Sequence, residues 1–168
     1  DFKYDYGTDF SSNKAIVREK NKWCIIDTMG KILRDINSDF DICKKFDENN
    51  LALTFKGKVK SGKPIKGKYG LINIDGNDVS DCQYDTIYSF VDDLAIVRSN
   101  KKYGFIDKTG KEIIPIQYDF AFPFSDGLAC VKKNGFYGFI DKSNQVIIQF
   151  KYYYAHPFIN GIAKVFSE

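Results

Sequence analysis

The segment YGFIDKTGKEIIP at positions 103–115 recurs, with substitutions, at a period of 34 residues. One period later the chain contains YGFIDKSNQVII at 137–148, and one period earlier it contains YGLINIDG at 69–76. An internal repeat of this length is typical of arrays in which each unit packs only on its neighbours. We therefore expect one array forming one domain, without a single central core.

The repeat divides the chain into one partial unit, one stretched unit and three regular units. They occupy 1–22, 23–68, 69–102, 103–136 and 137–168, respectively. The stretched unit begins with WCIIDTMG and is 12 residues longer than the regular units. Most of its extra residues fall in an insertion at 54–68.

Within a unit, the pattern predicts short antiparallel strands. Residues 103–106 alternate as the side chains of a strand do. The Asp and Gly of 107–110 suit a hairpin turn, and 111–114 is expected to return as the partner strand. Pro115 is expected to end that strand, because it has no amide proton to donate. A third strand is predicted at 128–132.

Residues 118–127 show neither strand alternation nor the length of a helix, so we expect a connecting loop with at most one helical turn. The composition, with 28% charged and 16% aromatic residues, suits strands that have one buried face and one wet face. We predict an all-β array of about four and a half units, each with two or three antiparallel strands. Stacking as a solenoid or superhelix is expected, and a small closed ring like a β-propeller is the alternative.

The units resemble the bacterial WG-repeat family, also written KWG. Its pattern begins with five consecutive residues, namely an aromatic residue, Gly, an apolar residue, Ile and Asp. A Gly follows, and then, at intervals, Ile-Ile-Pro, Tyr-Asp, Phe and Gly-Leu-Ala-Val. Trp23 supplies the Trp, with Cys24 where the pattern has Gly, and Tyr replaces Trp in the regular units. The structural repeat positions are the rings Trp23, Tyr69, Tyr103 and Tyr137, the glycines Gly70, Gly104 and Gly138, the acids Asp27, Asp107 and Asp141, and the rings Phe90, Phe124 and Phe158.

This resemblance covers essentially the whole chain. It implies an all-β repeat scaffold that works by binding, often in exported or envelope-associated bacterial proteins, and it implies no catalytic residues. A secreted or cell-envelope location is therefore favoured over a cytoplasmic one.

The repeated acids are expected to cap turns rather than bind metal. Asn73 occupies the same phase as Asp107, and an amide serves a turn as well as a carboxylate does. A calcium site would need several oxygens, whereas the loop 107–110 offers one carboxylate. We predict no metal and no cofactor.

Catalysis is not expected. His156 is the only histidine, and Tyr88 and Phe122 occupy its phase in other units, so it is predicted to be a packing residue with a polar tip. The cysteines occupy four different phases without a C-x-x-C pair, which favours free thiols. They are Cys24, Cys43, Cys82 and Cys130. An unrecognised hydrolase is the less favoured alternative and would need a cleft that brings His156 together with two acids.

The insertion contains KGKVKSGKPIKGK at 56–68, a cluster of six lysines without an acid. The lysines are Lys56, Lys58, Lys60, Lys63, Lys66 and Lys68. They form either a solvated hairpin extension, whose lysines resist edge pairing, or a salt-sensitive site for an anionic partner. The net charge of +3 is too small to indicate a specific nucleic acid.

We therefore expect a non-enzymatic scaffold that binds a protein partner, possibly one with an anionic surface, through the array and the insertion. Binding of glycan or cell wall by rows of exposed rings is the alternative. Against it, the motif rings share a strand face with Ile25, Leu71, Phe105 and Phe139, so they are predicted to lie largely buried between units. No run of apolar residues is long enough to span a membrane.

Overall fold

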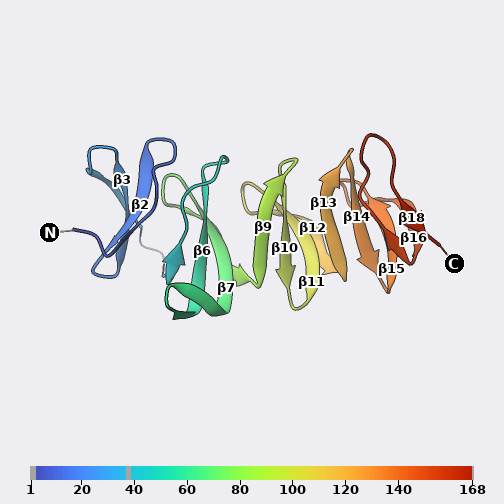
Figure 1. The fold of residues 1–168 in the computed structure, drawn as a ribbon, viewed down its shortest axis with the longest axis horizontal. Helices are drawn as coiled ribbons and strands as arrows, with labels where there is room; N and C mark the ends of the chain where they lie inside the picture. Colours follow the sequence, from blue (N-terminus) through green and yellow to red (C-terminus); the bar gives the residue numbers. More distant parts are fainter. Residues whose placement is uncertain (1–2, 37–38, 168) are drawn as a thin grey trace. The chain divides into compact units, whose positions relative to one another are not determined.

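The computed structural model describes residues 3–36 and 39–167, so the outermost residues of the first and last repeat units fall outside it. All the regular secondary structure in these ranges is β, and no described residue lies in a helix. The chain forms two compact units, Asp1–Tyr84 and Asp85–Glu168, called unit 1 and unit 2 below (Figure 1). The prediction of an all-β chain is confirmed.

Unit 1 contains two four-stranded antiparallel sheets. Sheet A consists of β1 (Tyr6–Gly7), β2 (Lys14–Glu19), β3 (Lys22–Asp27) and β4 (Ile32–Ile36). Sheet B consists of β5 (Ile42–Cys43), β6 (Leu51–Lys60), β7 (Lys63–Asn73) and β8 (Asp78–Tyr84). In both sheets, neighbouring strands are consecutive in sequence.

Unit 2 contains two further sheets of the same kind and a shorter two-stranded sheet. Sheet C consists of β9 (Thr86–Val91), β10 (Leu94–Ser99), β11 (Lys102–Asp107) and β12 (Glu112–Tyr118). Sheet D consists of β13 (Phe120–Ser125), β14 (Leu128–Lys133), β15 (Phe136–Ile140) and β16 (Val146–Tyr152). Sheet E consists of β17 (Tyr154–Ala155) and β18 (Val165–Phe166). None of these sheets closes into a barrel within the described ranges.

The repeat boundaries do not coincide with the sheet boundaries. The sequence repeat 103–136 contributes β11 and β12 to sheet C, and then β13 and β14 to sheet D. Each regular repeat therefore has four strands rather than the predicted two or three, and each repeat connects two successive sheets. The extra strand is β13, which lies within the segment 118–127 that was predicted to be a loop.

That prediction was wrong because β13 lacks regular alternation. Its register against β14 shifts between Ala121 and Phe124, with Pro123 in the irregular stretch. Pro115 likewise does not end its strand, since β12 continues to Tyr118. Both prolines lie in edge strands at irregularities, where a missing amide proton breaks no ladder bond.

The motif glycine makes room for such an irregularity. On β11 and β12, Tyr103 pairs with Tyr118 but Phe105 pairs with Ile114, so β12 bulges opposite Gly104. A Cβ atom at Gly104 would lie 2.6 Å from the Ile114 carbonyl oxygen. Gly70 and Gly138 face their partner strands in the same way, with 2.5 and 2.7 Å to a carbonyl oxygen.

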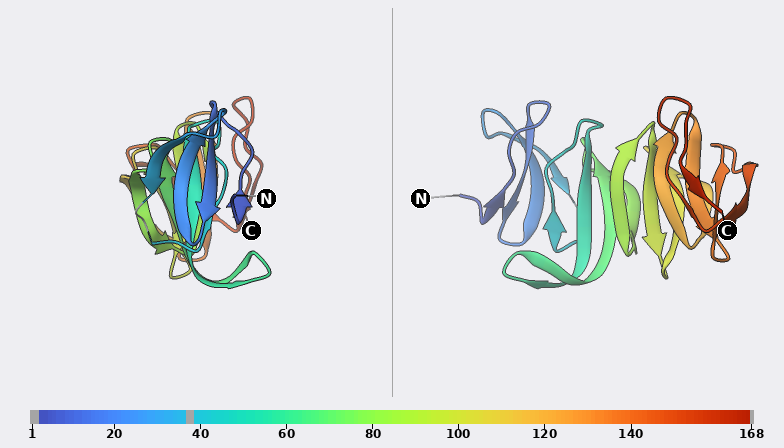
Figure 2. Two further views of the ribbon diagram at one scale, coloured as in Figure 1. Left: turned by 90° about the vertical axis from the view of Figure 1, so that its left-hand side faces the viewer. Right: turned by 45° about the vertical axis from the view of Figure 1, so that its right-hand side comes forward.

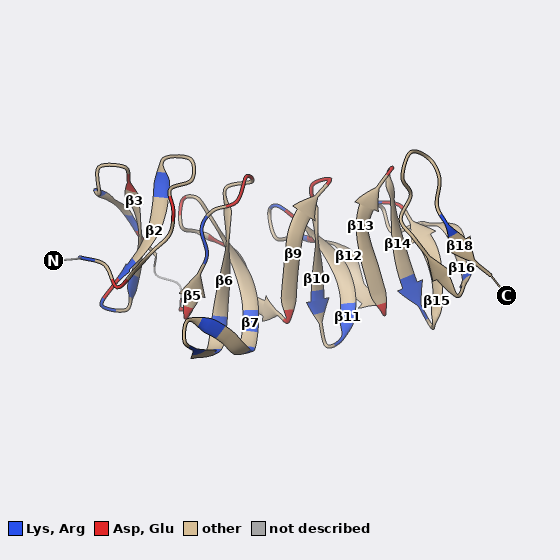
Figure 3. Cartoon of the chain, in the orientation of Figure 1, with Lys and Arg blue, Asp and Glu red and all other residues tan. Residues whose placement is uncertain are grey.

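Sheet D buries side chains on both faces, which corrects the expectation of one wet face. Ala129 and Val131 belong to the core shared with sheet C. Cys130 and Phe139 belong to the core shared with sheet E. A sheet stacked between two others has no free face, so the charged residues lie at strand ends and turns instead (Figure 3).

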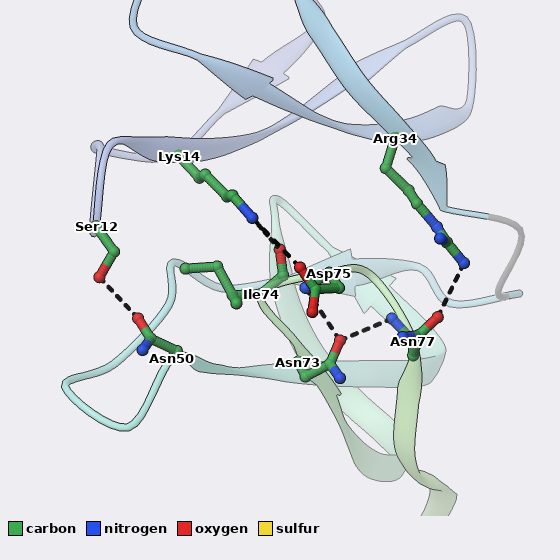
Figure 4. Close-up of polar contacts among 8 residues, drawn as sticks. All are labelled: Ser12, Lys14, Arg34, Asn50, Asn73, Ile74, Asp75 and Asn77. Carbon is green, nitrogen blue, oxygen red and sulfur yellow. Dashed lines mark hydrogen bonds and ion pairs between the residues drawn. The ribbon is translucent and has the colours of Figure 1, made fainter.

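Polar contacts join the two sheets of unit 1 along the rim of their shared core (Figure 4). The Ser12 hydroxyl donates to the Asn50 side-chain oxygen at 2.7 Å, and Arg34 donates to that of Asn77 at 2.9 Å. Lys14 donates to the Ile74 carbonyl oxygen at 3.3 Å. Within the described ranges, no helix is long and apolar enough to cross a membrane.

Candidate functional site

The insertion forms the outer half of the longest hairpin, β6–β7. The inner half pairs Ala52 with Ile72 and Phe55 with Tyr69, and all four side chains are at least half-buried. The outer half continues to the pair Lys60 and Lys63, and Ser61-Gly62 forms the turn with φ of 50° and 72°. Two positive φ angles give the turn the twist that suits a two-residue hairpin. We call residues 56–68 the lysine hairpin.

The register of the lysine hairpin places lysine opposite lysine three times. The cross-strand pairs are Lys56 with Lys68, Lys58 with Lys66, and Lys60 with Lys63. Directly opposed side chains lie about 5 Å apart, and like charges in such pairs destabilise a sheet. On β6 the three lysines alternate and so share one face, about 6.7 Å apart. On β7 the register shifts after the Lys58–Lys66 pair, so Lys63 lies three positions from Lys66. We call the three pairs the lysine ladder.

Two acids fix the base of this hairpin. Lys56 forms an ion pair with Asp39, and the hydrogen bond that the Lys56 ammonium donates to the Asp39 carboxylate raises the pKa of Lys56 above its ordinary value. The Gly57 amide donates to Asp41 at 2.7 Å. Gly57 also pairs with Gly67, and a Cβ atom on either would lie within 2.4 Å of the opposite strand, so only glycine allows this approach. Beyond this point the hairpin curls away from the other strands of sheet B (Figure 2).

The outer lysines are the most accessible part of this charge. Lys58, Lys60, Lys63 and Lys66 are exposed, whereas Lys68 is half-buried. No ion pair found among the described residues involves any of those four exposed lysines. Because six lysines exceed the whole net charge of +3, the rest of the chain has more acids than bases.

Three of the motif rings, Trp23, Tyr103 and Tyr137, pack in cores between sheets, as predicted, whereas Tyr69 contacts Phe55 of its own sheet. Trp23 and Tyr137 are buried, with 5% and 8% of their surface exposed, while Tyr69 and Tyr103 are half-buried. The Trp23 ring nitrogen donates to the Phe40 carbonyl oxygen at 3.1 Å. The residues that share a face with the rings are almost completely buried, namely Ile25, Leu71, Phe105 and Phe139. The rings therefore form no exposed row for a glycan.

A cation above the motif ring was not predicted from the sequence. Arg18 lies 5.3 Å from the Trp23 ring, and Arg98 lies 5.7 Å from the Tyr103 ring. Lys132 occupies the same phase, 5.2 Å from the ring of Tyr137. The cation and ring are opposed across the hairpin that joins two successive repeats. The sequence signal was a basic residue five positions before these three rings, whereas Tyr69 has Pro64 at that position.

The turn acids cap turns, as predicted. Asp107 Oδ1 accepts from the amides of Thr109 and Lys111, and the turn is closed by a bond from the Gly110 amide to the Asp107 carbonyl oxygen. Asp27, Asp141 and Asn73 form the same pattern. In Asp107, burial opposes ionisation, but hydrogen bonds from the Thr109 side chain and backbone lower the carboxyl pKa.

The acid of the Tyr-Asp pair has a second capping role that the sequence did not reveal. Asp85 accepts from the Asn100 amide at 2.9 Å, and Asp5 accepts from the Lys20 amide at 2.8 Å. Each acid thereby closes the second turn that follows it, that of β10–β11 for Asp85 and that of β2–β3 for Asp5. Asp41 occupies the same phase but accepts from the Gly57 amide within the β6–β7 ladder, so it anchors the base of the lysine hairpin.

The repeated phenylalanines pack against the strands that precede them. Phe124 is buried, and its ring centroid lies 5.1 Å from that of Phe105. Phe158 is half-buried and lies 4.9 Å from Phe139. Phe90 is half-buried as well.

The groups suited to catalysis are dispersed. His156 is exposed and contacts the Tyr154 ring at 5.0 Å, so its predicted packing contact exists, although the side chain is not buried. The four cysteines are free thiols, and burial raises the pKa of Cys24, Cys43 and Cys130. In residues 3–36 and 39–167, no three His, Cys, Asp or Glu side chains form a group that could hold a metal ion.

A family model described as "WG containing repeat" matches four segments of the chain, at residues 1–23, 69–103, 103–135 and 137–166. Residues 24–68, which include the lysine hairpin up to Lys68, lie outside these segments. No curated protein matches the chain significantly. The lysine hairpin is therefore a feature of this chain that the repeat pattern does not account for.

Proposed function

Because the chain belongs to the WG-containing repeat family, we propose that it is a non-enzymatic binding scaffold whose partner is a protein with an acidic surface. The lysine hairpin is the proposed contact surface. The repeats supply the sheets, and the hairpin supplies a feature that those sheets do not need for packing.

The observation that carries this proposal is the lysine ladder. The two outer Lys–Lys pairs, Lys58 with Lys66 and Lys60 with Lys63, destabilise the free hairpin, and an acidic surface would relieve that repulsion on binding. The attraction would act on association rate and specificity, and it would weaken with salt. Outside the hairpin, acids outnumber bases by 22 to 19, so the net positive charge of the chain comes from these six lysines.

The composition of the hairpin favours a protein over a nucleic acid. Residues 56–68 contain no aromatic ring on which a base could stack and no arginine to form a two-pronged contact with phosphate. Lysines on flexible stems suit carboxylates spread over a protein surface. The dispersed His and Cys side chains support the non-enzymatic part of the proposal.

The test uses labelled poly-glutamate as the probe and fluorescence anisotropy as the measurement. The variant K58Q/K60Q/K63Q/K66Q should lose about tenfold or more in affinity, because the loss of four cationic contacts removes most of the attraction. The control variant K31Q/K44Q/K101Q/K111Q changes the net charge equally at exposed lysines elsewhere. Equal weakening by both variants would show that only net charge matters and would refute the hairpin as the site.

A further inference from the structure

One position pair changes its chemistry between successive repeats in unit 2. Lys102 and Asp119 form an ion pair at the base of sheet C. The residues 34 positions later are Phe136 and Tyr153, whose ring centroids lie 5.4 Å apart at an angle of 54°. An exposed ion pair in one repeat is thus an aromatic pair in the next.

One backbone hydrogen bond is equivalent at the two pairs. The Asp119 amide donates to the Lys132 carbonyl oxygen at 2.8 Å, and the Tyr153 amide donates to the Phe166 carbonyl oxygen at 2.9 Å. The side chains therefore change at positions whose amide keeps the same kind of partner. A repeat that needed only a stable hairpin at this point could retain the ion pair.

The aromatic pair is accessible. Phe136 and Tyr153 expose 37% and 50% of their surface, which is high for large rings that could pack on a neighbour. Together with Phe150 and Lys151 they line an open hollow of about 370 Å³. That volume is at the lower end of the range for ligand pockets.

The lining of this hollow indicates the chemistry of its ligand. The lining residues are three aromatic side chains and Lys151. The Lys151 ammonium, which only donates, lies 5.3 Å from the ring centroid of the neighbouring Tyr152. A sugar has many hydroxyl groups that donate hydrogen bonds, and carboxylate or amide side chains usually accept them. No carboxylate or amide side chain is among the residues that line the hollow. A proline-rich segment offers apolar ring faces and carbonyl acceptors with few donors, and such segments dock in aromatic-lined grooves.

We infer that this hollow binds a proline-rich peptide segment in the polyproline II conformation, with an acidic side chain next to the prolines that meets Lys151. The site lies wholly in unit 2 and does not depend on the lysine hairpin. It would be a second protein-binding surface of the scaffold.

The experiment measures the affinity of the full chain for a labelled oligoproline peptide with a central glutamate, by fluorescence anisotropy. A Gly-Ser peptide with the same glutamate is the control ligand. The variant F136K/Y153D restores the Lys–Asp pair of the preceding repeat, so it should fold normally and weaken oligoproline binding about tenfold or more. The variant K151Q keeps the rings and should reduce the preference for glutamate over glutamine in the peptide.

Three results would overturn the inference. One is equal affinity of the parent chain for the oligoproline and Gly-Ser peptides. Another is unchanged oligoproline binding in a folded F136K/Y153D protein. The third is saturable binding of a neutral oligosaccharide by the parent chain, abolished in F136K/Y153D, without oligoproline binding, which would assign the hollow to a glycan.

Discussion

The hairpins β6–β7 and β10–β11 occupy the same phase of the repeat but end at different lengths. Both pair a buried Ala with a buried Ile, Ala52 with Ile72 in one and Ala95 with Ile106 in the other. In β10–β11 the ladder stops at the pair of Ser99 with Lys102. In β6–β7 the ladder continues through the lysine hairpin.

The difference separates stability from binding. The shared inner part is buried between sheets, so its residues carry the packing free energy. The extension is exposed from Lys56 to Lys66, so it can vary without disturbing a core. Substitutions in the inner part should therefore affect unfolding strongly, and substitutions in the extension should affect it little.

The largest effect should come from the motif ring that is most deeply placed. Trp23→Ala removes a buried ring and the hydrogen bond to the Phe40 carbonyl, and should lower the free energy of unfolding by about 4 kcal/mol. Tyr103→Ala should lower it by about 3 kcal/mol, because that ring is only half-buried. Urea denaturation of the two variants gives both values. A Trp23→Ala protein as stable as the parent would contradict the assignment of this ring to the core.

The next effect concerns the glycine that faces the bulge. Gly104→Ala should cost about 3 kcal/mol, because a Cβ atom there would lie 2.6 Å from a backbone oxygen that the bulge holds in place. Cys24 occupies the equivalent position in sheet A, where β3 and β4 pair without a bulge opposite it. Cys24→Ala should therefore cost only about 1 kcal/mol. Similar losses in the two variants, measured by thermal unfolding, would refute the role of the bulge.

The contrast between regular pairing and bulged pairing also explains how far the sequence could predict the fold. The repeat pattern identified the strands with regular alternation, the turn acids and the buried rings. It failed where a register shift breaks the alternation, as in β13, because the side-chain pattern there no longer follows a period of two. It also could not show that sheets begin in the middle of a repeat, since sequence similarity marks where a pattern recurs and not which strands pair. The solenoid arrangement of the whole array stays a prediction.

The candidate sites were predicted unevenly for a related reason. The lysine hairpin was visible because it departs from the repeat in length and charge. The pair of Phe136 and Tyr153 departs only in chemistry, and its two members are 17 positions apart in the sequence. Comparing each repeat with the next at both positions would have revealed the exchange of an ion pair for two rings, but only the fold shows that these positions are in contact.

In the extension, removing charge should have a small effect of the opposite sign. The variant K58Q/K60Q/K63Q/K66Q relieves two opposed Lys–Lys pairs, so the free energy of unfolding should stay the same or rise by up to about 1 kcal/mol. The control K31Q/K44Q/K101Q/K111Q should leave it unchanged within error. Differential scanning calorimetry at low salt is the sensitive measurement. A clear loss of stability in the first variant alone would mean that the lysines pack in the folded state.

The smallest effect concerns the turn acids, which stand in the hairpins that follow Trp23, Tyr103 and Tyr137, whereas Asn73 takes their place after Tyr69. Asp141 accepts from the Ser143 hydroxyl at 2.7 Å and from the Gln145 amide at 2.8 Å, and these bonds hold its carboxyl pKa below the ordinary value of 3.8. A pKa that is lower in the folded state adds stability at pH values above the unfolded pKa, and this stability is lost as the pH falls through the folded pKa.

The variant Asp141→Asn keeps the accepting oxygen, as Asn73 does naturally with bonds of 3.0 Å. The variant should therefore melt like the parent at neutral pH but lose less stability between about pH 5 and pH 2, because it has no carboxylate to protonate. If the free energy of unfolding falls equally with decreasing pH in the two proteins, the pKa of this carboxyl does not change on folding.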